Sequence, residues 1–192
     1  MRETIKVQSE RFYSEHHRLL RIARHSLGNA KKKEPGWADD EFLAITLSAL
    51  AIEAIYNAVG ERAVNKWGNF ESCNPTAKAR IICTHLHIKY DSSREPWATL
   101  LWLSIFRNLV AHPKAATIAE SKVVSEQDHA QGTHRTAPKS KLEKRVTLQN
   151  AEKAIKAVDV ALSLFCEKLS IEDQFGISGD MWSVSSRRQD GG

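Results

Sequence analysis

Large apolar residues recur every three or four positions along most of the chain, which is the spacing of an amphipathic helix. This pattern predicts helices over residues 9–27, 39–67, 77–90 and 96–112, with a last helix over 148–169. No alternation of Val and Ile of the kind that predicts a strand competes with it. We therefore expect an all-α protein, folded as a bundle of four to five helices.

Local signals support several of these helix boundaries. Asn74, followed by a proline, indicates a helix start, because proline is preorganised for the first turn. Thr147 can cap the last helix through its hydroxyl. Gly28 predicts the end of the first helix. The helix over 96–112 is apolar nearly all round, so we expect it to be the buried centre of the bundle.

The remaining segments indicate one domain with two polar stretches. Residues 1–175 contain all the predicted helices and are enough for a single domain with its own core. Within them, 114–146 is a long polar insertion before the last helix, interpreted as a mobile connection, with a short hairpin as an alternative. Its Lys and Arg residues either are solvated or follow a phosphate backbone. Residues 176–192 predict a flexible C-terminal tail.

Composition narrows the class of protein. The net charge of +5 favours contact with a polyanion such as nucleic acid. The three cysteines are odd in number and far apart, which argues against a disulfide framework and for a reducing compartment. The apolar stretch over 97–106 is shorter than the ~20 residues of a membrane span, and the first residues lack a secretory signal pattern. We expect a soluble, cytoplasmic protein with no membrane partner.

The strongest candidate site closes the apolar helix. Arg107 and Asn108 lie near its end, where a buried guanidinium or amide requires a polar partner. His112 follows Asn108 by four residues, on the same helix face, and Pro113 disfavours helical backbone at the residue before it. We therefore expect the helix to end at His112. Histidine changes its charge near neutral pH, so an imidazole at this position suits proton transfer.

Residues 107–112, with the sequence RNLVAH, resemble the motif of an Arg, a polar residue and then a His in HEPN-domain ribonucleases. The similarity covers about 42–113 and the last helix, because the motif ends a late apolar helix and an earlier long helix carries AIEAIYNA. Other pairs of an Arg and a His at comparable spacing lack the Asn, the apolar helix and the Pro; these pairs are Arg11 and His16, Arg18 and His25, and Arg80 and His85.

The resemblance implies metal-independent endonucleolytic cleavage of RNA, in which a 2′-hydroxyl attacks the adjacent phosphate and leaves a cyclic phosphate and a 5′-hydroxyl. In that reaction His112 transfers the proton, Arg107 binds the phosphate and stabilises its developing charge, and Asn108 orients His112 or a phosphate oxygen. No metal or other cofactor is implied. Such proteins commonly dimerise with two motifs in one cleft, so RNA and a second copy are the expected partners. A role in defence, as a toxin or in RNA processing would fit, with a neutralising antitoxin or other partner protein.

Glu53 and Asn57 form a polar stripe on an otherwise apolar helix, one turn apart. Two interpretations of this stripe are open. Both residues support the cleft, or Glu53 pairs with Arg107 to neutralise a buried charge and takes no part in the chemistry.

Alternatives remain for the site and for the whole protein. Arg107 and His112 have a structural interpretation, in which a cation favours the dipole at the helix C-terminus and the imidazole packs against a neighbour. The alternative to a ribonuclease is a non-catalytic helical module that binds RNA or a protein. The neighbouring histidines at 16–17 and 85–87 lack the companion ligands of a zinc site. A Gly-rich phosphate loop and a serine-hydrolase elbow are both missing, which disfavours those two classes.

Overall fold

The computed structural model describes residues 5–132, 135–179 and 182–188. Helices dominate this part of the chain, as predicted, and two short strands form a small sheet. The elements in chain order are β1 (Ile5–Arg11), α1 (His16–Lys32), α2 (Trp37–Ala63), the 3-10 helix η1 (Trp67–Phe70), α3 (Pro75–His85), α4 (Trp97–Ala111), α5 (Glu126–Gln131), the 3-10 helix η2 (Glu143–Arg145), α6 (Leu148–Cys166) and β2 (Trp182–Arg188).

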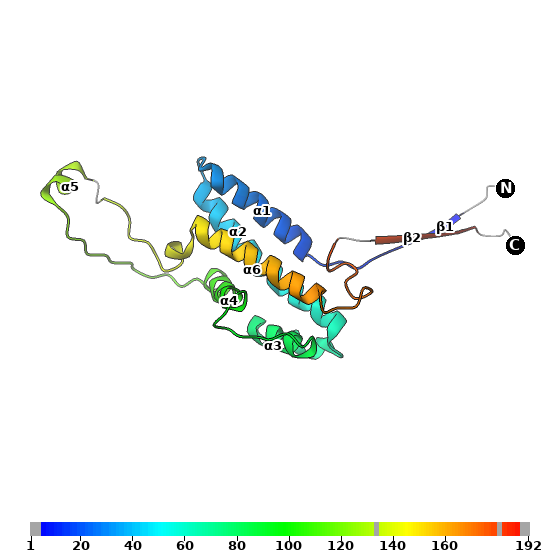
Figure 1. The fold of residues 1–192 in the computed structure, drawn as a ribbon. Coiled ribbons are helices and arrows are strands. Elements are labelled where there is room, and N and C mark those ends of the chain that lie inside the picture. The colour runs from blue at the N-terminus through cyan, green and yellow to red at the C-terminus, as the bar shows by residue number, and fades with distance from the viewer. Residues whose placement is uncertain (1–4, 133–134, 180–181, 189–192) are drawn as a thin grey trace.

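The central helix of the bundle is α2, which packs against α1, α3, α4 and α6 (Figure 1). The expectation that α4 is the buried centre is wrong. Phe106 of α4 is fully buried, but Ile105 and Leu109 on the outer side of that helix are 47% and 37% exposed. Apolar composition alone does not distinguish a helix at the centre of a core from one that leaves an apolar strip at the surface.

One described helix, α2, is long and apolar enough to cross a membrane by length and composition alone. Its most apolar stretch of 18 residues is 56% buried inside the protein. The core helix of a soluble bundle passes the same test, and α2 packs against four other helices, α1, α3, α4 and α6. Helix α2 is longer than the apolar stretch over 97–106, from which the sequence predicts no membrane span.

Several predicted helix ends are displaced; α3 ends at His85 and not at Tyr90, and α6 ends at Cys166 and not at Leu169. The first helix continues through Gly28 and ends at Lys32; the next residue, Lys33, takes a left-handed conformation with φ 54° and donates its N–H to the Ala30 carbonyl. The second helix ends at Ala63 and not near Trp67. The chain turns there, and η1 brings Trp67 back onto α2, where its side chain is 2% exposed.

The predicted starts of α3 and α6 are confirmed. The Asn74 side chain accepts a hydrogen bond from the Ala77 N–H at 2.9 Å. The Thr147 hydroxyl accepts one from the Asn150 N–H at 3.2 Å. A second group assists the start of α6, because the buried carboxyl of Glu41 in α2 accepts a hydrogen bond from the Leu148 backbone. Burial is the main influence on this carboxyl and raises its pKa.

The polar insertion extends away from the bundle as a long arm that carries α5 at its far end (Figure 1). Ser125 caps α5 by accepting a hydrogen bond from the Asp128 N–H, and Gly132 ends it in a left-handed conformation. The alternative of a short hairpin is therefore replaced by a short helix. The second 3-10 helix lies where the chain returns to the bundle before α6.

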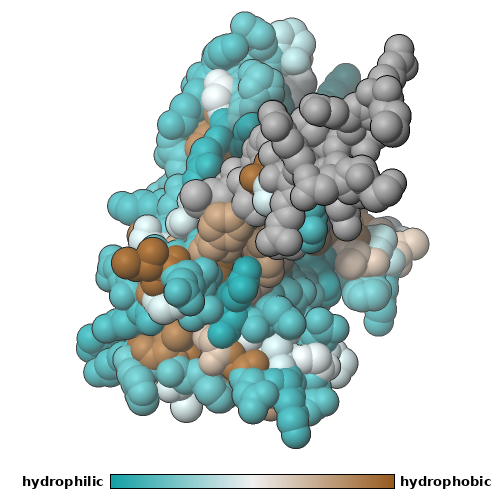
Figure 2. Space-filling view, turned by 90° about the vertical axis from the view of Figure 1, so that its right-hand side faces the viewer, coloured by the Kyte–Doolittle hydropathy of each residue, from teal (hydrophilic) through white to brown (hydrophobic). Residues whose placement is uncertain are grey.

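The sheet joins the two ends of the described chain. β1 and β2 pair antiparallel from Ile5 opposite Arg188 to Arg11 opposite Trp182, so both ends of the described chain lie on one side of the bundle (Figure 1). Figure 2 views the molecule from that side and shows a mostly hydrophilic surface with a few hydrophobic patches. The prediction of helix from residue 9 is wrong here, and within the predicted flexible tail residues 182–188 form a strand, because the two segments satisfy each other's backbone groups. Residues 180–181 and 189–192 of that tail lie outside the described residues.

The chain before β2 is held against the start of α1 by two histidines. His16 Nε2 donates to the Ile177 carbonyl at 3.0 Å, and His17 Nε2 donates to the Gly176 carbonyl at 2.9 Å. His16 and Ile177 are fully buried. Burial, followed by repulsion from His17, lowers the pKa of His16 from 6.5 to about 4. A Cβ on Gly176 would overlap the ring of Phe12, so the backbone at this position can lie against Phe12 only because the residue is glycine.

The lowered pKa of His16 makes the stability of the fold sensitive to acid. The unfolded chain takes up a proton near pH 6.5, whereas the folded chain does so only near pH 4. The contribution of His16 to the free energy of unfolding is therefore fully present above pH 6.5. The free energy of unfolding falls by on the order of 3 kcal/mol as the pH drops to 4. His16→Gln retains a donor for Ile177 without titrating, so urea melts of this variant should show a flatter dependence on pH. His25→Gln, on the exposed side of α1, should keep the wild-type slope.

Candidate functional site

The RNLVAH motif occupies the last turn of α4, as the sequence predicted. The helix ends at Ala111, and His112 leaves the helical conformation with φ −128° and ψ 59° while its N–H still bonds the Asn108 carbonyl at 3.0 Å. Pro113 explains this end, because it disfavours helical backbone at the residue before it. His112 is exposed, and its imidazole has no hydrogen-bond partner within the described chain. A substrate can therefore reach the ring.

Arg107 forms the ion pair that the sequence analysis considered for it. Its Nη2 lies 2.8 Å from Oε2 of Glu53 in α2, and its Nη1 donates to Oδ1 of the adjacent Asn108 at 3.0 Å. The side chains of Arg107 and Glu53 are 32% and 23% exposed. A guanidinium has five N–H donors, so these two bonds fix its orientation and leave donors for a further anion.

Asn57 does not join this group, although it lies one turn after Glu53. Its Oδ1 accepts a hydrogen bond at 2.8 Å from Nζ of Lys78 in α3, and the Lys78 residue is only 2% exposed. The structure thus divides the predicted polar stripe into two parts. Glu53 contacts the motif, whereas Asn57 satisfies a buried lysine between α2 and α3. Lys78 is a site residue beyond those predicted; its spacing from Ile82, which places both residues on the buried face of α3, is the signal that indicates it.

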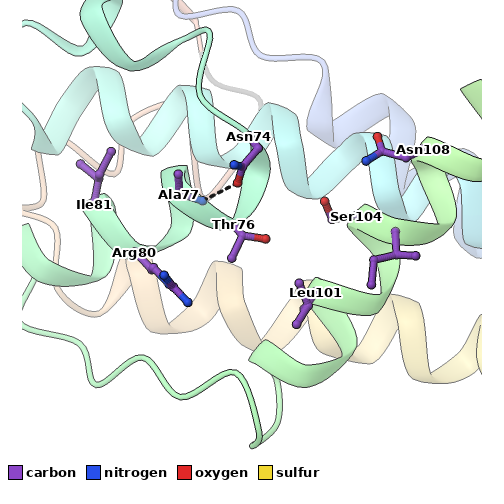
Figure 3. A pocket seen from close by; sticks show the side chains of 9 residues that line it. Asn74, Thr76, Ala77, Arg80, Ile81, Leu101, Ser104 and Asn108 are labelled. Atoms are coloured by element: carbon purple, nitrogen blue, oxygen red, sulfur yellow. Dashed lines mark hydrogen bonds between the residues drawn. The ribbon is translucent and has the colours of Figure 1, made fainter.

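A groove between α3 and α4 begins beside the motif and has a volume of about 660 Å³ (Figure 3). Asn108 forms part of its wall, together with Arg80 and Ile105. The remaining lining residues are Asn74, Thr76, Ala77, Ile81, Leu101 and Ser104. We name this feature the α3–α4 groove. Its wall carries one arginine and no carboxylate, so it suits a neutral or anionic ligand with an apolar part.

The sequence did not identify the α3–α4 groove as part of the candidate site. In the sequence, Arg80 stands out only through its spacing from His85, and Thr76 and Ser104 carry no signal. These residues come together because α3 packs beside α4, a contact between segments about twenty-five residues apart in the chain. A short motif carries no information about such a contact.

The described residues include no group of three or more His, Cys, Asp or Glu side chains placed to hold a metal ion. Cys83 is buried, and burial raises its pKa to about 12, which makes its thiol a poor nucleophile at neutral pH. The chemistry available at the motif is therefore that of an imidazole, a guanidinium and an amide. These groups can transfer a proton and stabilise an anion.

Comparisons of this chain with protein-family models, with curated proteins and with solved structures found no match. The class that fold and site define is a helical bundle whose Arg-Asn-x3-His motif lies at the end of α4. The case for a function therefore depends on the chemistry of this site.

Proposed function

We propose that this chain is a metal-independent endoribonuclease of the HEPN type, acting in defence, as a toxin or in RNA processing. The observation that carries the proposal is the motif itself. Arg107 is oriented by Glu53 and Asn108, and His112 follows one turn later with its imidazole open to solvent. A fixed cation and, five residues later, an accessible imidazole are the two kinds of group that cleavage of RNA by its own 2′-hydroxyl requires.

In the proposed reaction, the 2′-hydroxyl oxygen attacks the adjacent phosphorus and the bond to the 5′-oxygen of the next nucleotide breaks. His112 transfers the proton that leaves the 2′-hydroxyl or the proton that the departing 5′-oxygen gains. Arg107 binds the phosphate oxygens and stabilises the charge that develops on them. Because Asn108 Oδ1 accepts from Arg107, its amide N–H₂ is the part left to donate to a phosphate oxygen.

The α3–α4 groove supports an extended substrate, because Asn108 belongs both to the motif and to the wall of the groove. The groove offers apolar surface for a base and Arg80 for a phosphate. RNA is thus the partner that the site favours. A nucleotide next to the cleaved bond would lie in this groove.

The proposed enzyme is a homodimer. Ile105 and Leu109 are exposed apolar residues one turn apart on α4, and His112 continues the same side of the helix three residues later. A second copy that covers the two apolar side chains would bring its own motif near this one and double the local positive charge. A neutralising partner protein could cover the same surface.

The direct test is incubation of the purified chain with total RNA in EDTA, followed by sizing of the RNA and analysis of the fragment ends. The proposal requires fragments with cyclic-phosphate and 5′-hydroxyl ends. Intact RNA across several substrate pools would contradict it and favour the alternative, a non-catalytic helical module that binds RNA or a protein. One observation favours that alternative. Two donors of Arg107 are already bonded within the protein, as they would be if the arginine had a structural role only.

Arg107→Ala should lower the cleavage rate by about a hundredfold to a thousandfold, the effect of removing a donor that stabilises transition-state charge. It should also lower stability by about 1–2 kcal/mol, because Glu53 loses its partner in a site that water still reaches. The double variant Arg107→Ala with Glu53→Gln removes the unpaired charge and should regain most of the stability but none of the activity. Initial rates on a labelled RNA and thermal melts measure the two effects.

The matched control for Arg107 is Arg94→Ala, because Arg94 is exposed and pairs with Asp91 away from the motif. This variant should keep wild-type activity. If the double variant at Arg107 and Glu53 cleaved RNA at the wild-type rate, Arg107 would have a structural role only.

A further inference from the structure

The outer surface of α1 is the most strongly basic helix face of the described chain, and the proposed cleavage site does not use it. The helix contains five Lys and Arg residues, three His and no Asp or Glu. Its buried face, with Leu20, Ala23 and Ala30, packs against α2 and α6. In Figure 1, α1 lies on the far side of α2 and α6 from α3.

Two sides of α1 differ in how their charge is compensated. On the side next to α6, Arg24 pairs with Asp159 at 2.6 Å and Lys31 pairs with Glu152 at 2.8 Å. On the other side, positions 21, 25, 28 and 32 follow one another at helical spacing and are all exposed. We call these residues, Arg21, His25, Gly28 and Lys32, the α1 stripe. The stripe has no ion pair or side-chain hydrogen bond within the described chain.

Gly28 is the feature that distinguishes the α1 stripe from an ordinary solvated helix face. Glycine inside a helix lowers stability by about 0.5–1 kcal/mol relative to alanine. The fold does not require it here, because a Cβ at this position would meet nothing within 4 Å. Its effect is to leave a gap between His25 and Lys32, where a ligand can approach the helix backbone closely.

A membrane surface is a poor partner for the α1 stripe. A helix that lies in a membrane inserts its apolar face into the lipid. The apolar face of α1 is already buried against α2, and Ile22, at 38% exposure, is the large apolar residue on its outer side. A polyanion with regularly spaced charges needs no apolar insertion and fits the stripe better.

We propose that the α1 stripe is a second nucleic-acid contact, which binds the phosphate backbone of RNA apart from the cleavage site. At about 1.5 Å per residue, Arg21 and Lys32 lie about 16 Å apart along the helix, room for several successive phosphates. The gap at Gly28 admits the backbone between them. The choice of RNA as the polyanion rests on the proposed function, but the binding surface itself does not.

The first test measures binding without cleavage. In the His112→Ala background, the double change Arg21→Gln and Lys32→Gln is compared with Lys66→Gln and Lys168→Gln, which removes two charges from exposed lysines elsewhere. The probe is a fluorescein-labelled RNA hairpin followed by anisotropy over a range of salt. The stripe variant should bind several-fold more weakly, with the slope of log K against log salt reduced by roughly one per residue. The control should bind like its parent.

The second test uses Gly28→Ala, for which stability and binding should change in opposite directions. The variant should melt at a higher temperature, because alanine favours the helix, yet bind the hairpin more weakly, because its methyl group fills the gap. Unchanged affinity and salt slope in the Arg21 and Lys32 variant would overturn the proposal. Binding to anionic phosphatidylserine vesicles that depends on the stripe, without binding to RNA, would overturn it as well. If the wild type does not cleave RNA but binds it in a way that depends on the α1 stripe, the ribonuclease function is refuted and the proposed RNA contact on α1 is supported.

Discussion

His112→Ala should lower the rate of RNA cleavage by about a hundredfold to ten-thousandfold, the range over which a positioned proton-transfer group acts. The same change should leave stability within about 0.5 kcal/mol of the wild type, because an exposed side chain without a hydrogen-bond partner adds little to the fold. The backbone at His112 has negative φ, which alanine also adopts. Initial rates on labelled RNA in EDTA, measured beside thermal melts, separate activity from folding.

A matched pair of controls makes this result specific. His85→Ala removes another exposed histidine, at the end of α3 and outside the lining of the α3–α4 groove, and should leave the chemical step unchanged at saturating RNA. His112→Gln keeps a polar side chain that cannot transfer a proton at neutral pH, and should be as inactive as the alanine variant. Cleavage by His112→Gln at the wild-type rate would show that His112 only orients the substrate. Activity in both His112 variants would remove this residue from the mechanism.

Those parts of the fold that depend on neighbouring residues were predictable. Asn74 and Thr147 each bond a backbone N–H three residues later, so the sequence alone indicates where α3 and α6 begin. The help that Glu41 gives to α6 was not predictable, since it reaches across from α2. The same holds for the sheet, because β1 and β2 come from opposite ends of the chain and neither has a distinctive strand pattern.

The same distinction holds within the site. The placement of Arg107, Asn108 and His112 at the end of α4 follows from the apolar pattern and Pro113, and the ion pair with Glu53 was one of two open interpretations. The bond between Asn57 and Lys78 and the α3–α4 groove depend on how α3 packs, which the periodicity of each helix leaves undetermined. Gly28 is a further residue whose position the local pattern did not predict. The sequence indicated that it ends the first helix, whereas its proposed role depends on the exposed surface that α1 forms around it.

Gly60→Ala should lower stability by about 2–3 kcal/mol, although alanine is the better helix former at an interior position. Gly60 lies in α2 with the indole of Trp67 directly against its backbone, and a Cβ there would overlap the indole ring. Because both residues are buried, the ring has no room to move aside. The melting temperature should fall by roughly 5–10 °C for a chain of this size.

The cause can be tested through the partner residue. In a Trp67→Leu background the overlap is absent, so Gly60→Ala should stop being destabilising and add the benefit of its helix propensity, about 0.5–1 kcal/mol. Gly28→Ala provides the contrast within the wild type, since the space around it is open and its melting temperature should rise. A higher melting temperature for Gly60→Ala in the wild type would mean that Trp67 does not lie on α2. Opposite signs at the two glycines would show that tertiary contact, and not helix propensity, determines the effect of alanine at each position.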